Sequence, residues 1–235
     1  MKVELIIALD CQNTAQIEHV LSTLPPSISW FKVGLELFVA AGKEAIKILL
    51  EKNKNIFLDL KLHDIPNTVA SAVKSSLQYK PQLITIHASG GIEMIKAAKQ
   101  AVINSGLNYP KIIAVTTLTS LNEQDLKIQG ITRSLQNHVV EMAKIAIQAG
   151  ADGIVCSPLE TAIIRKEVGR KPIIITPGIR FAENDTHDQK RAASPQTAIK
   201  DGANFLVVGR PILQAKDPYA TALKILSEIN NASTL

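Results

Sequence analysis

The sequence predicts an α/β protein with a single-domain (β/α)8 TIM-barrel fold, and three observations lead to this prediction. Short β-rich segments alternate with helical segments eight times along the chain, which is typical of a parallel sheet. The 235 residues provide the length that eight such units need. A doubly wound dinucleotide-binding fold is the alternative, but LDCQNT follows the first apolar run, where that fold usually has a glycine-rich turn.

The expected strands are short apolar runs bounded by polar or glycine-containing turns. In chain order they cover residues 3–9, 30–34, 56–61, 82–87, 111–116, 153–156, 172–176 and 205–208. Helical segments lie between them, and the clearest cover residues 36–52, 91–104, 135–148 and 218–229.

Local signals mark where several helices begin and end. Asp217 and Ser194 each precede a proline, a pattern that predicts an N-cap with proline at the first helical position. Gly150 and Gly202 each lie shortly before an expected strand, where glycines that end helices belong.

The composition indicates one globular domain over residues 1–235, because 46% of the residues are hydrophobic and 20% are charged. The net charge of +5 is modest, and aromatic residues make up only 4%, which argues against nucleic-acid binding. A small anionic substrate suits the same charge.

Features of targeting and redox chemistry favour a cytoplasmic protein. The apolar runs are too short to span a membrane, and Glu4 interrupts the first of them, so no signal peptide is expected. Only Cys11 and Cys156 occur, which fits packing residues in a reducing compartment rather than a disulfide framework.

The stretch IFLDLKLHDIPNT, residues 56–68, places charged residues on an apolar strand. Side chains alternate across a strand, so Asp59 and Lys61 point to one face. Ile56, Leu58 and Leu60 point to the other face. Helices cover one face of each strand in a barrel, so Asp59 and Lys61 are expected in the barrel interior or at its rim.

Other polar residues lie at the carboxyl ends of the strands, where active sites of these barrels form. Asp10 ends the first strand, Lys32 stands alone in WFKVGL, and Asp64 follows the third strand. His87 ends the fourth strand, and TTLTS follows the fifth.

A phosphate site is expected after the seventh and eighth strands, its common place in this fold. Gly178 and Gly209 allow the backbone to approach an anion, and Arg180 and Arg210 add charge-assisted hydrogen bonds. Residues 179–193, which include Gln189, form a long connection of the kind that often covers a site.

Each of these residues also has a purely structural interpretation. Asp59 and Lys61 could form a buried ion pair, and Arg180 and Arg210 could be surface residues. His87 is better explained as a strand-end histidine than as a metal ligand, and no second ligand at metal-binding spacing accompanies it. Two lysines and at least two aspartates opposite a phosphate site nevertheless favour a functional array over coincidence.

These residues resemble the orotidine 5'-monophosphate decarboxylase family. The motifs span almost the whole chain in the family's order, and LTS at 118–120 and the GIR…DQ…R arrangement at 178–191 resemble its bacterial branch. No catalytic position departs from the family pattern. The motifs are IALD (7–10), FKVG (31–34), DLKLHDIPNT (59–68), TPGIR (176–180) and VVGRP (207–211).

The resemblance implies decarboxylation of orotidine 5'-monophosphate to uridine 5'-monophosphate without a cofactor or a metal. Lys61 is the implied proton donor to the ring carbon, and Asp59 lies beside the departing carboxylate. Lys32 and Asp64 complete an alternating array of lysines and aspartates. Asp64 comes from the neighbouring subunit of a homodimer with shared active sites.

The resemblance also implies a set of substrate contacts. Asp10 and Thr68 contact the ribose, with Thr68 crossing the dimer interface, and Thr119 lies near the pyrimidine. The phosphate is held by Arg180, Gln189, Gly209 and Arg210.

Two alternatives remain open. A related sugar-phosphate decarboxylase uses the same Asp-x-Lys-x-x-Asp motif with Mg²⁺, but is expected to lack Lys32 and the DIPNT continuation. A non-catalytic phosphate-ligand binder on the same barrel does not need an alternating charge array.

Overall fold

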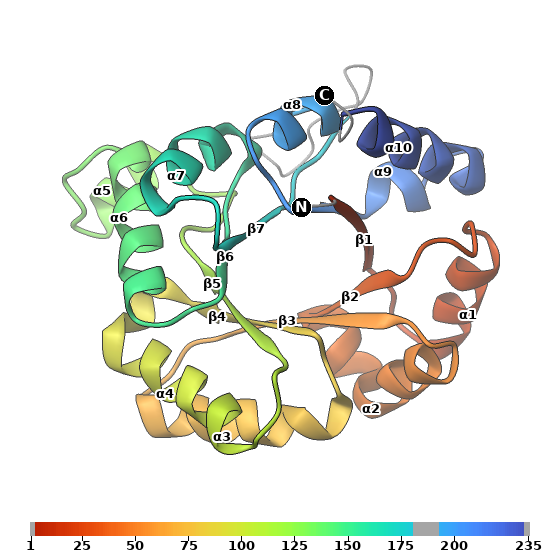
Figure 1. The fold of residues 1–235 in the computed structure, drawn as a ribbon. Helices are drawn as coiled ribbons and strands as arrows, with labels where there is room; N and C mark the ends of the chain where they lie inside the picture. The colour runs from red at the N-terminus through yellow and green to blue at the C-terminus, as the bar shows by residue number, and fades with distance from the viewer. Residues whose placement is uncertain (1–2, 181–192, 233–235) are drawn as a thin grey trace.

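Eight parallel strands close into a barrel in the part of the chain that the structure describes, residues 3–180 and 193–232 of a computed structural model. Neighbouring strands pair in chain order, and the last strand returns to pair with the first. Helices form a ring outside the strands (Figure 1). The predicted (β/α)8 fold is confirmed.

Each strand lies within one residue of its predicted bounds. Continuous apolar runs rich in β-branched residues favour these strands, because both faces of a closed parallel barrel are covered. The strands are β1 (Glu4–Leu9), β2 (Trp30–Gly34), β3 (Asn55–Leu62), β4 (Leu83–His87), β5 (Lys111–Val115), β6 (Gly153–Val155), β7 (Ile173–Thr176) and β8 (Phe205–Val208).

The helices agree with the predicted segments and fill the intervals between the strands. They are α1 (Thr14–Ser22), α2 (Leu35–Glu51), α3 (Pro66–Ser76), α4 (Gly91–Asn104), α5 (Glu123–Ile128), α6 (Leu135–Gln148), α7 (Thr161–Val168), α8 (Pro195–Lys200), α9 (Arg210–Leu213) and α10 (Pro218–Ala232). None of them, within the described residues, is long and apolar enough to cross a membrane.

The predicted helix ends are confirmed. The Ser194 side chain accepts a hydrogen bond from the Thr197 amide, and Asp217 Oδ1 accepts one from the Ala220 amide. Gly202 follows α8 with a φ of 99°, a left-handed conformation that glycine adopts without steric cost.

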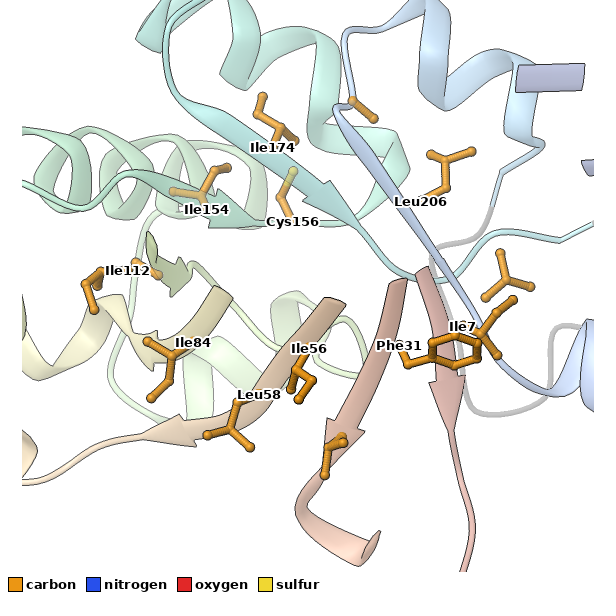
Figure 2. Close-up of a cluster of buried hydrophobic side chains, with 14 of the residues drawn as sticks. Ile7, Phe31, Ile56, Leu58, Ile84, Ile112, Ile154, Cys156, Ile174 and Leu206 are labelled. Atoms are coloured by element: carbon orange, nitrogen blue, oxygen red, sulfur yellow. The ribbon is translucent and has the colours of Figure 1, made fainter. Parts of the chain in front are cut away.

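The strands separate two apolar layers. The outer faces pack against the helices, and Figure 2 shows members of this layer from every strand, including Ile56 and Leu58 of β3. Phe57, which lies between them in sequence, belongs to a separate inner cluster. The inner cluster consists of Ile6, Ala8, Phe57, Leu83, Ile113, Ile175 and Val207.

A partly buried ion pair connects α4 to the amino ends of β5 and β6. Lys99 Nζ lies 2.7 Å from both carboxylate oxygens of Asp152, which immediately precedes β6. The backbone amide of Ile112 donates to the same carboxylate at 2.9 Å. One carboxylate thus ties a helix to two strands at the end of the barrel away from the expected site.

We expect Lys99→Met to lower the free energy of unfolding by about 1–3 kcal/mol, because the Asp152 carboxylate would keep its place without its charged partner. Denaturant unfolding at one fixed protomer concentration measures the effect. The control is Lys96→Met on the same helix, whose pair with Glu93 is exposed. That change should cost no more than about 0.5 kcal/mol. Equal losses in the two variants would contradict a special role for the Lys99 pair.

Candidate active site

The charged residues predicted on β2 and β3 meet at the carboxyl end of the barrel. Lys61 Nζ lies 2.8 Å from Asp59 Oδ2, and Lys32 Nζ lies 3.6 Å from the same oxygen. Asp10, just after β1, brings Oδ1 to 4.0 Å from Lys32 Nζ. Asp59 is the most buried of the four, with 10% of its side chain exposed. The structure thus brings two lysines and two aspartates together in one connected array.

Strand alternation explains the position of Asp59, but Lys61 reaches the array in a different way. Asp59 lies two residues after the inward-facing Phe57 and therefore also points inward, as predicted. The pairing of β3 with β4 then shifts: Leu58 pairs with Ile84, and Leu62 with Ile86. Lys61 lies inside this bulge with a φ of 51°, a left-handed conformation that is unusual for a residue other than glycine.

Sequence reasoning missed Thr85, which is fully buried on β4. Its hydroxyl donates to Asp59 Oδ1 at 3.0 Å and accepts from the Lys61 backbone amide at 2.8 Å. The sequence LITIH could have indicated this, because Thr85 lies two residues after Leu83 and so points to the same inner face. A polar residue on the inner face of the strand next to Asp59 was therefore a candidate.

Electrostatics keeps Asp59 ionised. Burial raises the pKa of Asp59, but the ammonium groups of Lys32 and Lys61 and hydrogen bonds from Lys61 and Thr85 outweigh burial and hold that pKa below its usual value. The carboxylate is therefore a permanent negative charge at neutral pH. It keeps both lysines close to one point of the cavity.

A cavity of about 270 Å³ extends from the charged array to the loops after β7 and β8. The array and Thr119 line it. Gly178, Arg180, Gly209 and Arg210, which are the residues expected around a phosphate, line it too. Phe57, Val155, Ile175, Pro177 and Val207 supply its apolar surface.

Two glycines leave room for charged groups of the array. A Cβ atom on Gly34 would stand 2.7 Å from Lys32 Nζ. One on Gly209 would stand 2.9 Å from Asp10 Oδ2. Side chains at these two positions would push the Lys32 ammonium or the Asp10 carboxylate from its place.

Not every predicted site residue lines this cavity. Asp64 and Thr68 are exposed and lie outside the set of residues that lines it. Asp64 Oδ1 accepts a hydrogen bond from the Ile65 amide at 2.7 Å. Gln189, and most of the segment 179–193 expected to cover the site, fall outside the described residues.

The residues given a structural interpretation are buried or partly buried. Cys11 and Cys156 are buried, and burial, followed by the Asp10 and Glu36 carboxylates, raises the pKa of the Cys11 thiol. The His87 ring lies 5.2 Å from the ring of His63. Burial, followed by His63, lowers the pKa of His87.

The metal prediction remains open. Among the described residues, no three His, Cys, Asp or Glu side chains form a group that could hold a metal ion.

The fold and the cavity place the chain in the class of (β/α)8 barrels with a charged cavity at the carboxyl ends of the strands. The sequence profile of the "Orotidine 5'-phosphate decarboxylase / HUMPS family" matches residues 3–225. The chain belongs to this family.

The chain is similar to named relatives over nearly their whole length. The chain is 43% identical to the orotidine 5'-phosphate decarboxylase of Idiomarina loihiensis, covering 96% of this chain and 97% of the relative. It is also 43% identical to that of Moorella thermoacetica, covering 97% and 92%. The crystal structure of orotidine 5'-phosphate decarboxylase from Lactobacillus acidophilus superposes with a TM-score of 0.86 at 40% identity, covering 97% of this chain and 99% of that one.

The low pKa of Asp59 leads to a prediction about stability and pH. The folded chain holds Asp59 ionised at a pH where the unfolded chain, with a pKa of about 3.9, takes up a proton. This contribution to stability is present above the unfolded pKa and is lost as the pH falls through the folded value. We therefore expect the stability of the parent relative to Asp59→Asn to decrease from about pH 5 to about pH 3.

Urea unfolding of both proteins across this range measures the difference, and the other carboxylates cancel because both proteins contain them. Glu44→Gln, which removes an exposed carboxylate, serves as the background control. A difference between parent and Asp59→Asn that stays constant or grows with acidity would contradict the expectation.

Proposed function

We propose that this chain is an orotidine 5'-phosphate decarboxylase, which converts orotidine 5'-phosphate to uridine 5'-phosphate and CO2 in the last step of UMP synthesis. The observation that carries the proposal is a single cavity lined by the Lys32–Asp59–Lys61 array together with Arg180 and Arg210. The named relatives, more than 40% identical over nearly full length, support the same reaction.

The chemistry of decarboxylation explains why two lysines are needed. Loss of CO2 from the pyrimidine ring leaves a carbanion, and enzymes as a class lower such barriers by roughly 8–23 kcal/mol. A fixed ammonium group stabilises charge that develops in the transition state without having to reorganise. We assign this role to Lys61, which would then protonate the ring carbon. Lys32 adds a second ammonium group near the Asp59 oxygen that Lys61 contacts.

Asp59 has the opposite relation to the substrate. As an ionised carboxylate beside the substrate carboxylate, it would repel that group, and the repulsion ends when CO2 leaves. The size of such a ground-state effect is contested, so we rank it below the stabilisation by Lys61.

The phosphate would be held by Arg180, Gln189, Gly209 and Arg210. Arginine forks and free backbone N–H groups suit phosphate oxygens. Binding energy from this remote group can orient the ring against the array, which raises the rate of the chemical step. Asp10 would contact the ribose. Thr119 lines the cavity and would contact the pyrimidine.

We assign Asp64 and Thr68 to the cavity of a second copy in a homodimer. Both are exposed here, outside the cavity of their own chain. Two large apolar side chains, Ile65 and Ile92, are also exposed, with 66% and 48% of their surface accessible. They lie at the same rim, because His63 approaches Gly90 and a groove joins Pro66 to Glu93. A partner covering this rim would bury them and receive Asp64.

The proposal includes three further parts. The reaction would need no cofactor and no metal, because the chain supplies the charges. The whole chain would form one domain, since β1 and β8 pair with each other and close the barrel. Its place would be the cytoplasm, where the reducing compartment suits two buried cysteines that are not joined in a disulfide.

We expect the purified protein to decarboxylate orotidine 5'-phosphate in excess EDTA at the rate measured without EDTA. Loss of orotate absorbance follows the reaction. Lys61→Ala is the matched control and should abolish turnover while UMP binding remains measurable. Absence of turnover by the parent would refute the proposal, and turnover only with added Mg²⁺ would favour the metal-dependent sugar-phosphate relatives.

Shared sites lead to a prediction about mixed dimers. Asp59→Asn and Asp64→Asn protomers should each be inactive alone, whereas their mixture should regain about a quarter of parental activity. In a mixture that exchanges fully, half of the dimers are hybrid, and each hybrid has one intact site and one doubly changed site.

The control mixes Asp59→Asn with Lys61→Ala protomers. Both residues act in their own chain's cavity, so every hybrid site keeps one defect and activity should not return. No recovery in the Asp59→Asn and Asp64→Asn mixture, after subunit exchange has been verified, would mean that Asp64 does not act across a dimer.

A further inference from the structure

Thr85 faces the irregular part of β3 alone. Between the pairs Leu58–Ile84 and Leu62–Ile86, three residues of β3 oppose this single residue of β4. The three are Asp59, Leu60 and Lys61. A bulge leaves backbone groups without their regular partners, and here the Thr85 hydroxyl accepts from the Lys61 amide at 2.8 Å.

The direction of both hydrogen bonds of Thr85 is fixed by the chemistry of its partners. A backbone amide can only donate, so the hydroxyl must accept from Lys61. Its one proton is then free for Asp59, whose ionised Oδ1 can only accept and lies 3.0 Å away. Thr85 is fully buried, so water does not compete for either bond.

The two oxygens of the Asp59 carboxylate have different partners. Oδ1 is held by Thr85, while Oδ2 meets Lys61 at 2.8 Å and Lys32 at 3.6 Å. If the carboxylate rotated, Oδ2 would leave the position between the two ammonium groups. The same hydroxyl supports the backbone of Lys61, whose left-handed conformation is strained in a residue other than glycine.

We propose that Thr85 is a positioning residue for the reaction: it fixes the plane of the Asp59 carboxylate and the backbone from which Lys61 reaches the substrate. Thr85 is absent from the cavity lining and acts only through these two residues. This inference rests on the proposed function. It adds an uncharged, buried residue on β4 to the charged array.

The test is Thr85→Val, which keeps the shape of the side chain and removes both hydrogen bonds. We expect kcat to fall about 10–100-fold, because small displacements of catalytic groups have effects of this size. KM and the Kd for UMP should change less than about threefold, because the phosphate loops are untouched. Thr85→Ser restores the hydroxyl and should bring kcat back to within about threefold of the parent.

The control is Thr161→Val, which removes another fully buried threonine hydroxyl away from the cavity, one that donates to the Ser157 carbonyl. Its kcat should equal that of the parent even if its melting temperature falls. If Thr85→Val does not fold, Thr85→Cys, with its weak donor and acceptor, should fold and show a reduced kcat at an unchanged KM.

Three results would overturn the inference while the parent enzyme still turns over orotidine 5'-phosphate. The first is an unchanged kcat in Thr85→Val or Thr85→Cys. The second is a fall in kcat accompanied by an equal rise in KM and in the Kd for UMP. The third is a failure of Thr85→Ser to restore kcat. Absence of turnover by the parent would refute the proposed function instead, so the two failures are distinguishable.

Discussion

The site depends on one ionised carboxylate, that of Asp59, buried at the carboxyl end of an apolar strand. Burying such a charge without partners would cost far more free energy than a folded chain can spare. Its partners come from three neighbouring strands: Lys32 on β2, Lys61 on β3 itself and Thr85 on β4. Only a sheet in which these strands are adjacent in this order places all three around one carboxylate. The side-by-side order of β2, β3 and β4 in the sheet is therefore a requirement of the charge array as well as its support.

The barrel separates stability from chemistry along its axis. Apolar side chains fill both faces of the strands, and the Lys99–Asp152 pair ties helix to strands at the amino ends. At the opposite end the requirement is space, since a side chain at Gly34 would meet the Lys32 ammonium. The small residue Gly34 and the strained backbone of Lys61 lie at the charged array. Burial of the apolar layers stabilises the fold enough to offset their cost.

The sequence predicted the elements, because both faces of each strand and the helix ends leave local signals such as the prolines after Ser194 and Asp217. It also predicted that Asp59 points inward, which follows from the two-residue alternation. The bulge at Lys61 could not be predicted in this way, because it arises from the register between two strands rather than from either strand alone. Thr85 was missed for a related reason: a threonine in a strand is common, and only its position opposite the bulge gives it a role.

In the reaction proposed here, the geometry around Lys61 would let the array act without first rearranging. Asp59 orients the ammonium group of Lys61. Thr85 on the neighbouring strand holds the Lys61 backbone in its left-handed conformation. A catalytic charge held in this way loses little stabilisation to reorganisation when a carbanion develops nearby. The strain at Lys61 and the burial of Asp59 are then costs of folding, met by the apolar layers before any ligand arrives. An arrangement of flexible surface charges would face a comparable cost within each turnover, when it directly raises the barrier.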